Sequence, residues 1–174
     1  MCDFSFFHKG ICILCLASIL SCQKKAQQQD NKELNSTVET AIQKTVSTES
    51  IKKKLVKDGF QVFDYVDEES GDTILMQQYF IAFLKKGSNR SQNKKEADSL
   101  QKLHLEHLGK MYKEGYADIS GPFGNDGDIR GITIYNTPTQ QIADSLANLD
   151  PMVRSKRLTV EIHPWWAAKG FSLR

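Results

Sequence analysis

The pattern of apolar and polar positions is clearest between residues 74 and 113. Ile74–Leu84 is rich in aromatic and β-branched residues and is followed by the polar stretch Lys85–Asn89, which predicts a strand and then a turn. From about Asn93 to Lys113 the spacing becomes helical. One broad face of this helix collects the following residues: Leu100, Leu103, His104, His107, Leu108, Met111 and Tyr112. We therefore expect both histidines to point toward the sheet.

A hairpin is predicted after this helix. Gly115 suits the left-handed position that follows the last turn of a helix. Tyr116–Ile119 and Ile129–Tyr135 have the composition of strands, and the segment between them is rich in glycine and aspartate. We expect the two strands to pair, with Phe123 in the connecting loop either plugging the core or reaching a ligand.

A second helix and a last strand complete the pattern. Thr137 is the predicted N-cap, Pro138 the first helical residue and Gln140 the capping-box residue. Asp150-Pro151 predicts the end of this helix, and Leu158–Ile162 predicts a strand.

The resulting order is strand, helix, strand, strand, helix, strand, which is the ferredoxin-like βαββαβ arrangement of an α+β domain. Both helices of this arrangement cover one face of the sheet, so the other face must be buried against something else. A second copy of the same sheet is the simplest partner. We therefore expect a homodimer, with the domain at residues 73–168.

The chain before this domain is less regular. Weakly periodic apolar positions between Ser36 and Leu55 permit an amphipathic helix. Phe60–Val66 predicts a strand or hairpin arm that ends at the polar turn Glu68–Asp72. Residues 22–72 are therefore expected to be a tether and an N-terminal extension, and the part from Gln23 to Asn35 is too polar to fold by itself.

The first 22 residues have the features of an export signal. Lys9 precedes an apolar run over Gly10–Leu20 that is short for a membrane-spanning helix. Ile19-Leu20-Ser21-Cys22 resembles the lipobox of bacterial lipoproteins, which implies a signal peptide at residues 1–21 and a lipid on Cys22. The protein would then be anchored to a membrane of the bacterial cell envelope, facing the periplasm. A plain cleaved signal, or a cytoplasmic protein with an apolar N-terminus, is the alternative.

Composition narrows the functional classes. A chain of 174 residues can bury one core but hardly two. The net charge is only +2 and the basic residues are scattered without interleaved aromatics, which argues against nucleic acid as a partner. All four cysteines lie in the first 22 residues, so cleavage would leave only a lipidated Cys22 and neither a catalytic thiol nor an intrachain disulfide.

Five short motifs follow one another between Gln78 and Trp166 and resemble the YCII-related domain family. They are His104-Leu105, Gly115, Gly121-Pro122, Gly131 and Asp150-Pro151. The resemblance covers about half of the chain. It implies a dimeric α+β barrel in which His104 and Asp150 are suspected of catalysis.

The chemistry of these residue types fits that implication. A histidine such as His104 can exchange a proton near neutral pH, and a carboxylate such as Asp150 would orient the ring. Arg130 is a candidate to hold an anionic or enolate oxygen. Aromatic side chains are the candidate walls of a substrate pocket: Tyr79, Phe123, Trp165 and Trp166. No cofactor is expected, and no metal, because no further ligand pattern accompanies His104 and His107.

Each of these residues also has a purely structural interpretation. His104 is then a hydrogen-bonded core residue, Asp150 a cap, Arg130 a surface ion pair and Trp165 part of a dimer interface. Three functions stay open: an enzyme of proton transfer, isomerisation or elimination on a small organic molecule, a non-catalytic binding module, and a structural lipoprotein. A cavity with His104 and Asp150 in hydrogen-bond reach would favour the enzyme. A cavity without that pair would favour the binding module, and absence of a cavity would favour the structural protein.

Overall fold

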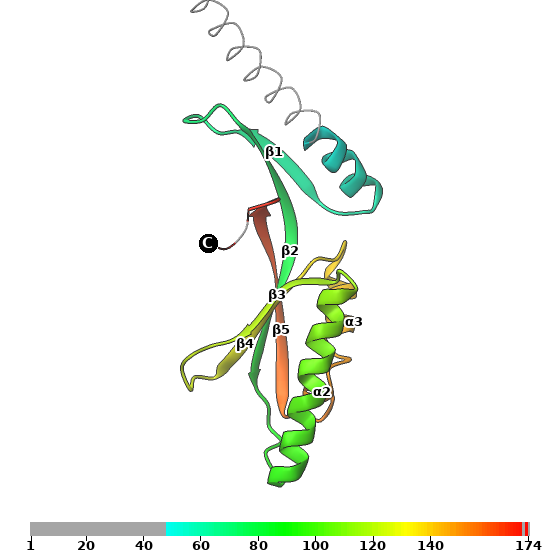
Figure 1. Cartoon of the computed structure of the whole chain (residues 1–174), viewed down its shortest axis with the longest axis vertical. Coiled ribbons are helices and arrows are strands. Elements are labelled where there is room, and N and C mark those ends of the chain that lie inside the picture. Colours follow the sequence, from blue (N-terminus) through cyan, green and yellow to red (C-terminus); the bar gives the residue numbers. More distant parts are fainter. Residues whose placement is uncertain (1–47, 172, 174) are drawn as a thin grey trace, which may run out of the picture. The chain divides into compact units, whose positions relative to one another are not determined.

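The sheet is built around one long strand, β2 (Thr73–Lys86) (Figure 1). The computed structural model describes residues 48–171 and 173, which belong to one compact unit. The proposed signal peptide, Cys22 and the tether from Gln23 to Asn35 lie outside the described residues.

Every strand pairing in the described sheet is antiparallel. β5 (Leu158–Ala168) pairs with β2 along one edge. β4 (Ile129–Tyr135) pairs with the second half of β2 along the other edge, and β3 (Ala117–Pro122) pairs with β4. The order β5–β2–β4–β3 is the one that a βαββαβ unit produces, so the predicted order of elements is confirmed.

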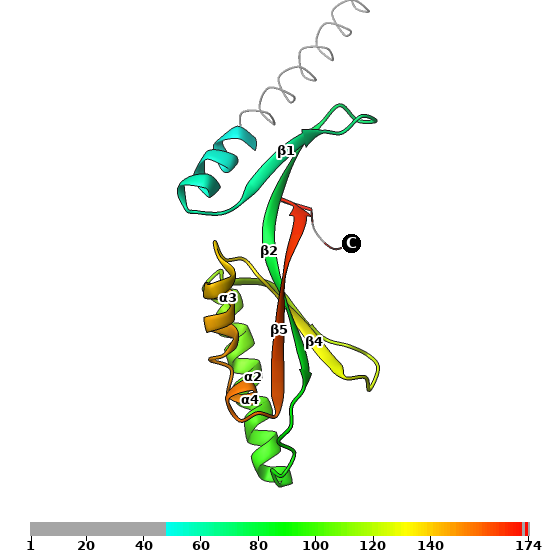
Figure 2. The ribbon, with the colours of Figure 1, turned by 180° about the vertical axis from the view of Figure 1, so that it is seen from behind.

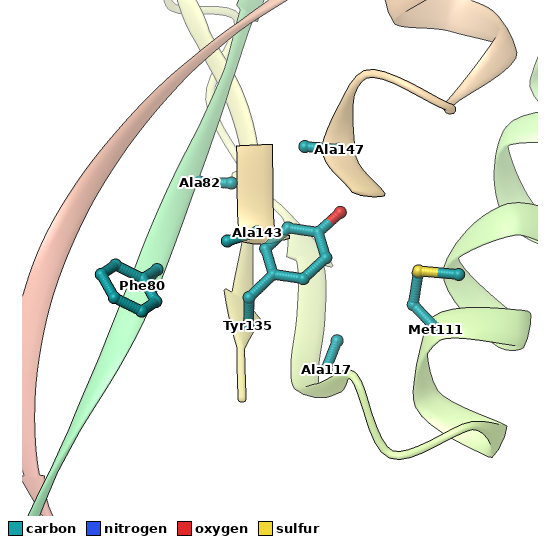
Figure 3. Packing of buried hydrophobic residues seen from close by; sticks show 7 residues of the cluster. All are labelled: Phe80, Ala82, Met111, Ala117, Tyr135, Ala143 and Ala147. Carbon is teal, nitrogen blue, oxygen red and sulfur yellow. The ribbon is translucent and has the colours of Figure 1, made fainter. Parts of the chain in front are cut away.

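The helices α2 (Lys94–Lys113), α3 (Gln140–Ala147) and α4 (Pro151–Arg154) lie on one side of the sheet in both views (Figures 1 and 2). Alternate residues of β2 point to this side, so Phe80 and Ala82 pack into the core between sheet and helices. Figure 3 shows this cluster, which has Tyr135 of β4 at its centre and Met111 of α2 opposite. Ile81 and Phe83, which alternate with them along β2, point to the other face.

The ends of α2 follow directly from the sequence. The Asn93 side chain accepts from the Glu96 backbone N–H while the Glu96 carboxylate accepts from the Asn93 N–H, which is a capping box. Gly115 has a φ of +76° just after the helix end, as predicted. The buried stripe is narrower than expected, because Leu103 and Tyr112 at its borders are exposed.

The second helical region differs from the prediction in two ways. Thr139, not Thr137, is the N-cap of α3, and the Thr137 side chain is buried and donates to the Thr139 carbonyl oxygen. Asp150-Pro151 does not end α3, which stops at Ala147, but begins the separate helix α4 with Asp150 as its N-cap. The dipeptide is therefore a start signal, consistent with proline at the first helical position.

The last strand is longer than predicted and runs through Pro164 to Ala168. Proline is tolerated there because β5 pairs with β2 alone in the described sheet, so one edge of β5 needs no backbone donor.

Residues before the predicted domain belong to the same unit. Residues 48–57 are helical, and β1 (Val62–Val66) forms a hairpin with the first half of β2, closed by the predicted polar turn. The remainder of the helix expected over Ser36–Leu55 lies outside the described residues. In the described part of the chain, each helix is too short or too polar to span a bilayer.

Candidate functional site

A cavity of about 490 Å³ lies between α2 and the sheet. Its size falls in the range of small-molecule sites, about 300–1,000 Å³. Its wall combines apolar side chains with one histidine and three arginines. The residues that line it are Leu84, Arg90, Ala97, Asp98, Gln101, His104, Leu105, Leu108, Ser120, Gly121, Pro122, Arg130, Gly131, Ile132, Met152, Arg157 and Leu158.

One glycine, Gly131, is required on the strand side of this cavity. A Cβ atom on Gly131 would lie only 2.6 Å from the Gly121 carbonyl oxygen of the neighbouring strand. A side chain at Gly131 would therefore push β3 and β4 apart. The Gly131 motif of the sequence thus has a packing reason at the cavity wall, whereas a Cβ atom on Gly121 would meet no atom within 4 Å.

His104 and Asp150 come together at this cavity. His104 is 8% exposed on α2, and Asp150, 2% exposed, precedes α4. The distance between His104 Nδ1 and Asp150 Oδ2 is 2.5 Å. The other carboxylate oxygen, Oδ1, accepts from the Met152 backbone N–H at 2.8 Å. Asp150 therefore caps α4 through Oδ1 and binds His104 through Oδ2.

The arrangement defines the proton positions of the imidazole. A carboxylate only accepts hydrogen bonds, so the proton between the two side chains is donated by Nδ1. In the neutral ring the lone pair is then on Nε2, the other nitrogen. Because Asp150 occupies Nδ1, Nε2 is the atom of His104 that a molecule in the cavity would meet. A ring held in this way can accept and return a proton.

Three arginines line the cavity, and one of them is paired with a carboxylate. Arg130 donates through Nη1 to Asp126 and to the Gly127 carbonyl oxygen, and this contact lowers the pKa of Asp126. Arg157 Nη1 donates to the Gln92 side-chain oxygen at 2.9 Å. Among the described lining residues only Asp98 carries a carboxylate, and it is paired with Lys94 at 2.6 Å.

Sequence reasoning missed Arg90 and Arg157. Neither lies in a motif, and both are in loops that meet only in the folded chain. The Gly87 N–H donates to the Arg157 carbonyl oxygen and the Asn89 N–H to that of Lys156, each at 3.0 Å. No local pattern signals such a contact.

The aromatic residues expected to wall the pocket lie elsewhere. Tyr79 and Trp165 are cross-strand partners with ring centroids 6.3 Å apart, on the side of the sheet that faces away from the helices. Burial raises the pKa of Tyr79 to about 12. Phe123 is 44% exposed, so it does not plug the core, and Trp166 contacts Phe63. The structure does not bring these side chains to the cavity of His104.

His107 lies one turn further along α2 and is outside the cavity lining. It is half-buried, and its Nε2 has no hydrogen-bond partner among the described residues. Desolvation lowers the pKa of His107, which favours a neutral packing role. Within residues 48–171 and 173 there is no group of three side chains placed to hold a metal ion.

A larger depression of about 890 Å³ runs along the outer side of α2, from Asp98 to Glu114. Its described lining comes from this one helix and its C-cap, so no polar groups from different elements converge there. We regard the His104 cavity as the candidate site for that reason.

Comparisons with known proteins add little to this geometry. No protein-family model matches the chain, and no curated protein sequence matches it either. A solved structure of 5-chloro-2-hydroxyhydroquinone dehydrochlorinase from Burkholderia phenoliruptrix, in complex with 2,5-dihydroxybenzoquinone, is similar with 17% sequence identity and a TM-score of 0.38. The similarity covers 50% of this chain and 92% of that chain. The chemistry of the site must therefore follow from its own side chains.

Proposed function

We propose that this protein is an enzyme that moves protons on a small organic molecule, with His104 as the general base and acid. The observation that carries the proposal is the hydrogen bond from His104 Nδ1 to the buried Asp150 carboxylate, at the wall of a ligand-sized cavity. A binding module needs the cavity but not this pair, and a structural protein needs neither.

The reaction would begin with transfer of a carbon-bound proton to His104 Nε2. The electron pair of the broken C–H bond then moves toward an oxygen of the substrate, and an arginine of the cavity stabilises the negative charge there. Asp150 stabilises the imidazolium that forms. In an isomerisation the electron pair returns from the oxygen and forms a bond between another carbon and the proton that His104 gives back. In an elimination the returning electron pair forms a new C=C bond as the bond to the leaving group breaks, and the leaving group departs with its electron pair and takes the proton from His104.

Hydrogen exchange tests this proposal before the substrate is known. We expect the protein to catalyse deuterium incorporation from D₂O into small carbonyl or carboxylic compounds, read by NMR. His104→Asn should reduce the rate about 10²–10⁴-fold, because it removes the Nε2 base. The amide nitrogen of the introduced side chain can take the place of Nδ1 and keep the bond to Asp150. Exchange at the wild-type rate in His104→Asn would contradict the assignment.

We extend the proposal to a homodimer with the geometry of a dimeric α+β barrel. The sheet face opposite the helices carries large apolar side chains: Ile81, Phe83, Ile119 and Trp165. A sheet face of this composition needs a cover. Sedimentation equilibrium of the unlipidated chain should give the mass of two chains, whereas a monomer at micromolar concentration would refute it.

We also propose that the domain is held at the cell envelope by a lipid on Cys22, which the lipobox-like sequence supports. Cys22→Ala should abolish incorporation of a labelled fatty acid and remove the protein from the lipid-anchored membrane fraction. Cys15→Ala, a change in the same apolar segment, should keep the label. A labelled Cys22→Ala protein would show that the anchor is elsewhere.

A further inference from the structure

We propose that the substrate is a small carboxylate with an apolar body, and that Arg157 holds its carboxylate group. This inference rests on the proposed function, because it names the substrate class of the same cavity. It assigns different tasks to arginines that the sequence alone does not distinguish.

Arg157 is the half-buried arginine whose charge is still available. Its Nη1 donates to Gln92, a neutral amide, at 2.9 Å, and no ion pair joins it to a carboxylate within the described residues. Arg130 differs, because Asp126 already neutralises it and its Nη1 also binds the Gly127 carbonyl oxygen. A guanidinium without a carboxylate partner, at the wall of a cavity, favours an anionic ligand that supplies one.

The backbone of Arg157 is held from both sides. Its N–H donates to the Met152 carbonyl oxygen, and its own carbonyl oxygen accepts from Gly87, both at 3.0 Å. Gly87 is required there, since a Cβ atom would lie 2.1 Å from the Lys156 carbonyl oxygen. The main chain of Arg157 is therefore fixed, and the hydrogen bond from Nη1 to Gln92 holds its guanidinium at the cavity wall.

The same segment also positions the base. Met152 donates its N–H to Asp150 and accepts with its carbonyl oxygen from Arg157, so α4 connects the partner of His104 to the arginine. His104 and Arg157 both line the cavity. Its apolar lining includes Leu84, Met152 and Leu158. A molecule with an acidic group at one end and an apolar body would meet Arg157 and His104 at the same time.

A carboxylate fits this wall better than a phosphate. Phosphate sites commonly use free backbone N–H groups at a helix N-terminus. Here the Glu96 N–H of α2 is bound by Asn93, and the Met152 N–H of α4 by Asp150. The guanidinium of the wall binds carboxylates and phosphates alike through its planar fork. The two occupied N–H groups are therefore what favours a carboxylate.

Three ligands with the same ring and different head groups test the inference by calorimetry on the purified protein: benzoate, benzamide and phenyl phosphate. We expect benzoate to bind at least about tenfold more tightly than either of the others, which corresponds to about 1.4 kcal/mol. Arg157→Gln should remove the preference for benzoate over benzamide, and Arg157→Lys should retain part of it. Arg154→Gln, an exposed neighbour on α4, should leave it unchanged.

Each other outcome would overturn the inference. Equal binding of benzoate and benzamide, no benzoate binding at millimolar concentration, or an unchanged preference in Arg157→Gln would exclude Arg157 as a carboxylate anchor. Tighter binding of phenyl phosphate would assign the site to phosphate. If the Arg157→Gln protein does not fold, the Arg157→Lys protein tests the inference instead. An unchanged preference for benzoate in Arg157→Lys would then exclude Arg157 as the anchor. In the wild-type protein, hydrogen exchange without a preference for benzoate would overturn only the substrate class. A preference for benzoate without hydrogen exchange would overturn only the proposed proton transfer.

Discussion

Asp150→Asn should lower the rate of proton transfer roughly 10²–10⁴-fold while the protein stays folded. The side-chain oxygen of the introduced amide can still accept from the Met152 N–H and cap α4, as Asp150 Oδ1 does. The amide nitrogen then faces His104 Nδ1 and donates to it, so the imidazole proton must move to Nε2. Without a lone pair on Nε2 the ring is no longer a base toward the cavity.

Nitrogen NMR of the His104 ring measures this change without a substrate. The wild-type neutral ring should carry its proton on Nδ1, and the ring in the Asp150→Asn variant should carry it on Nε2. Ligand affinity should change little, because Asp150 is not among the residues that line the cavity. If the Asp150→Asn variant keeps the wild-type tautomer of His104 and full activity, Asp150 acts only as the N-cap of α4.

Asp150→Ala should destabilise the fold by roughly 2–5 kcal/mol. The change removes the acceptor of two buried donors, His104 Nδ1 and the Met152 N–H. The orphaned His104 donor costs about 1–3 kcal/mol, and loss of the N-cap bond to the Met152 N–H costs about 0.5–2 kcal/mol. Urea unfolding of the two proteins gives the difference in the free energy of unfolding.

Asp144→Ala is the matched control for this measurement. Asp144 is an exposed aspartate of α3, and its substitution should change the unfolding free energy by no more than about 0.5 kcal/mol. If Asp150→Ala behaves like Asp144→Ala, the two hydrogen bonds of Asp150 contribute nothing to stability.

Helix α2 and the strands could be predicted from the sequence because the residue patterns that specify them are local. The helical apolar spacing and Gly115 act over one or two turns, and the structure uses both as predicted. The capping box of Asn93 and Glu96 is just as local, but it was not singled out from the sequence. The two threonines before α3 were not distinguishable, because burial of Thr137 depends on contacts with distant parts of the chain. Tertiary packing thus selects between two neighbouring caps of similar propensity.

In the candidate site, too, local sequence signals and tertiary contacts determine different features. The motif residues His104 and Asp150 were found together, but their 2.5 Å contact joins α2 to the start of α4 across 46 residues. Tyr79 and Trp165 were assigned to a pocket by residue type, and alternation along β2 places them on the sheet face away from the helices. Arg157 had no sequence signal at all.

The sequence by itself determined the order of the strands and of the two longer helices, and several of their ends, because periodicity, capping and turn chemistry act over a few residues. His104 and Asp150 became candidates in another way, through the resemblance of short motifs to those of a known family. The tertiary structure alone decided which side chains share the cavity, and that Arg130 has a carboxylate partner while Arg157 has none among the described residues. Those properties depend on contacts between segments far apart in the chain, and one residue of shift along a strand reverses the face on which a side chain lies.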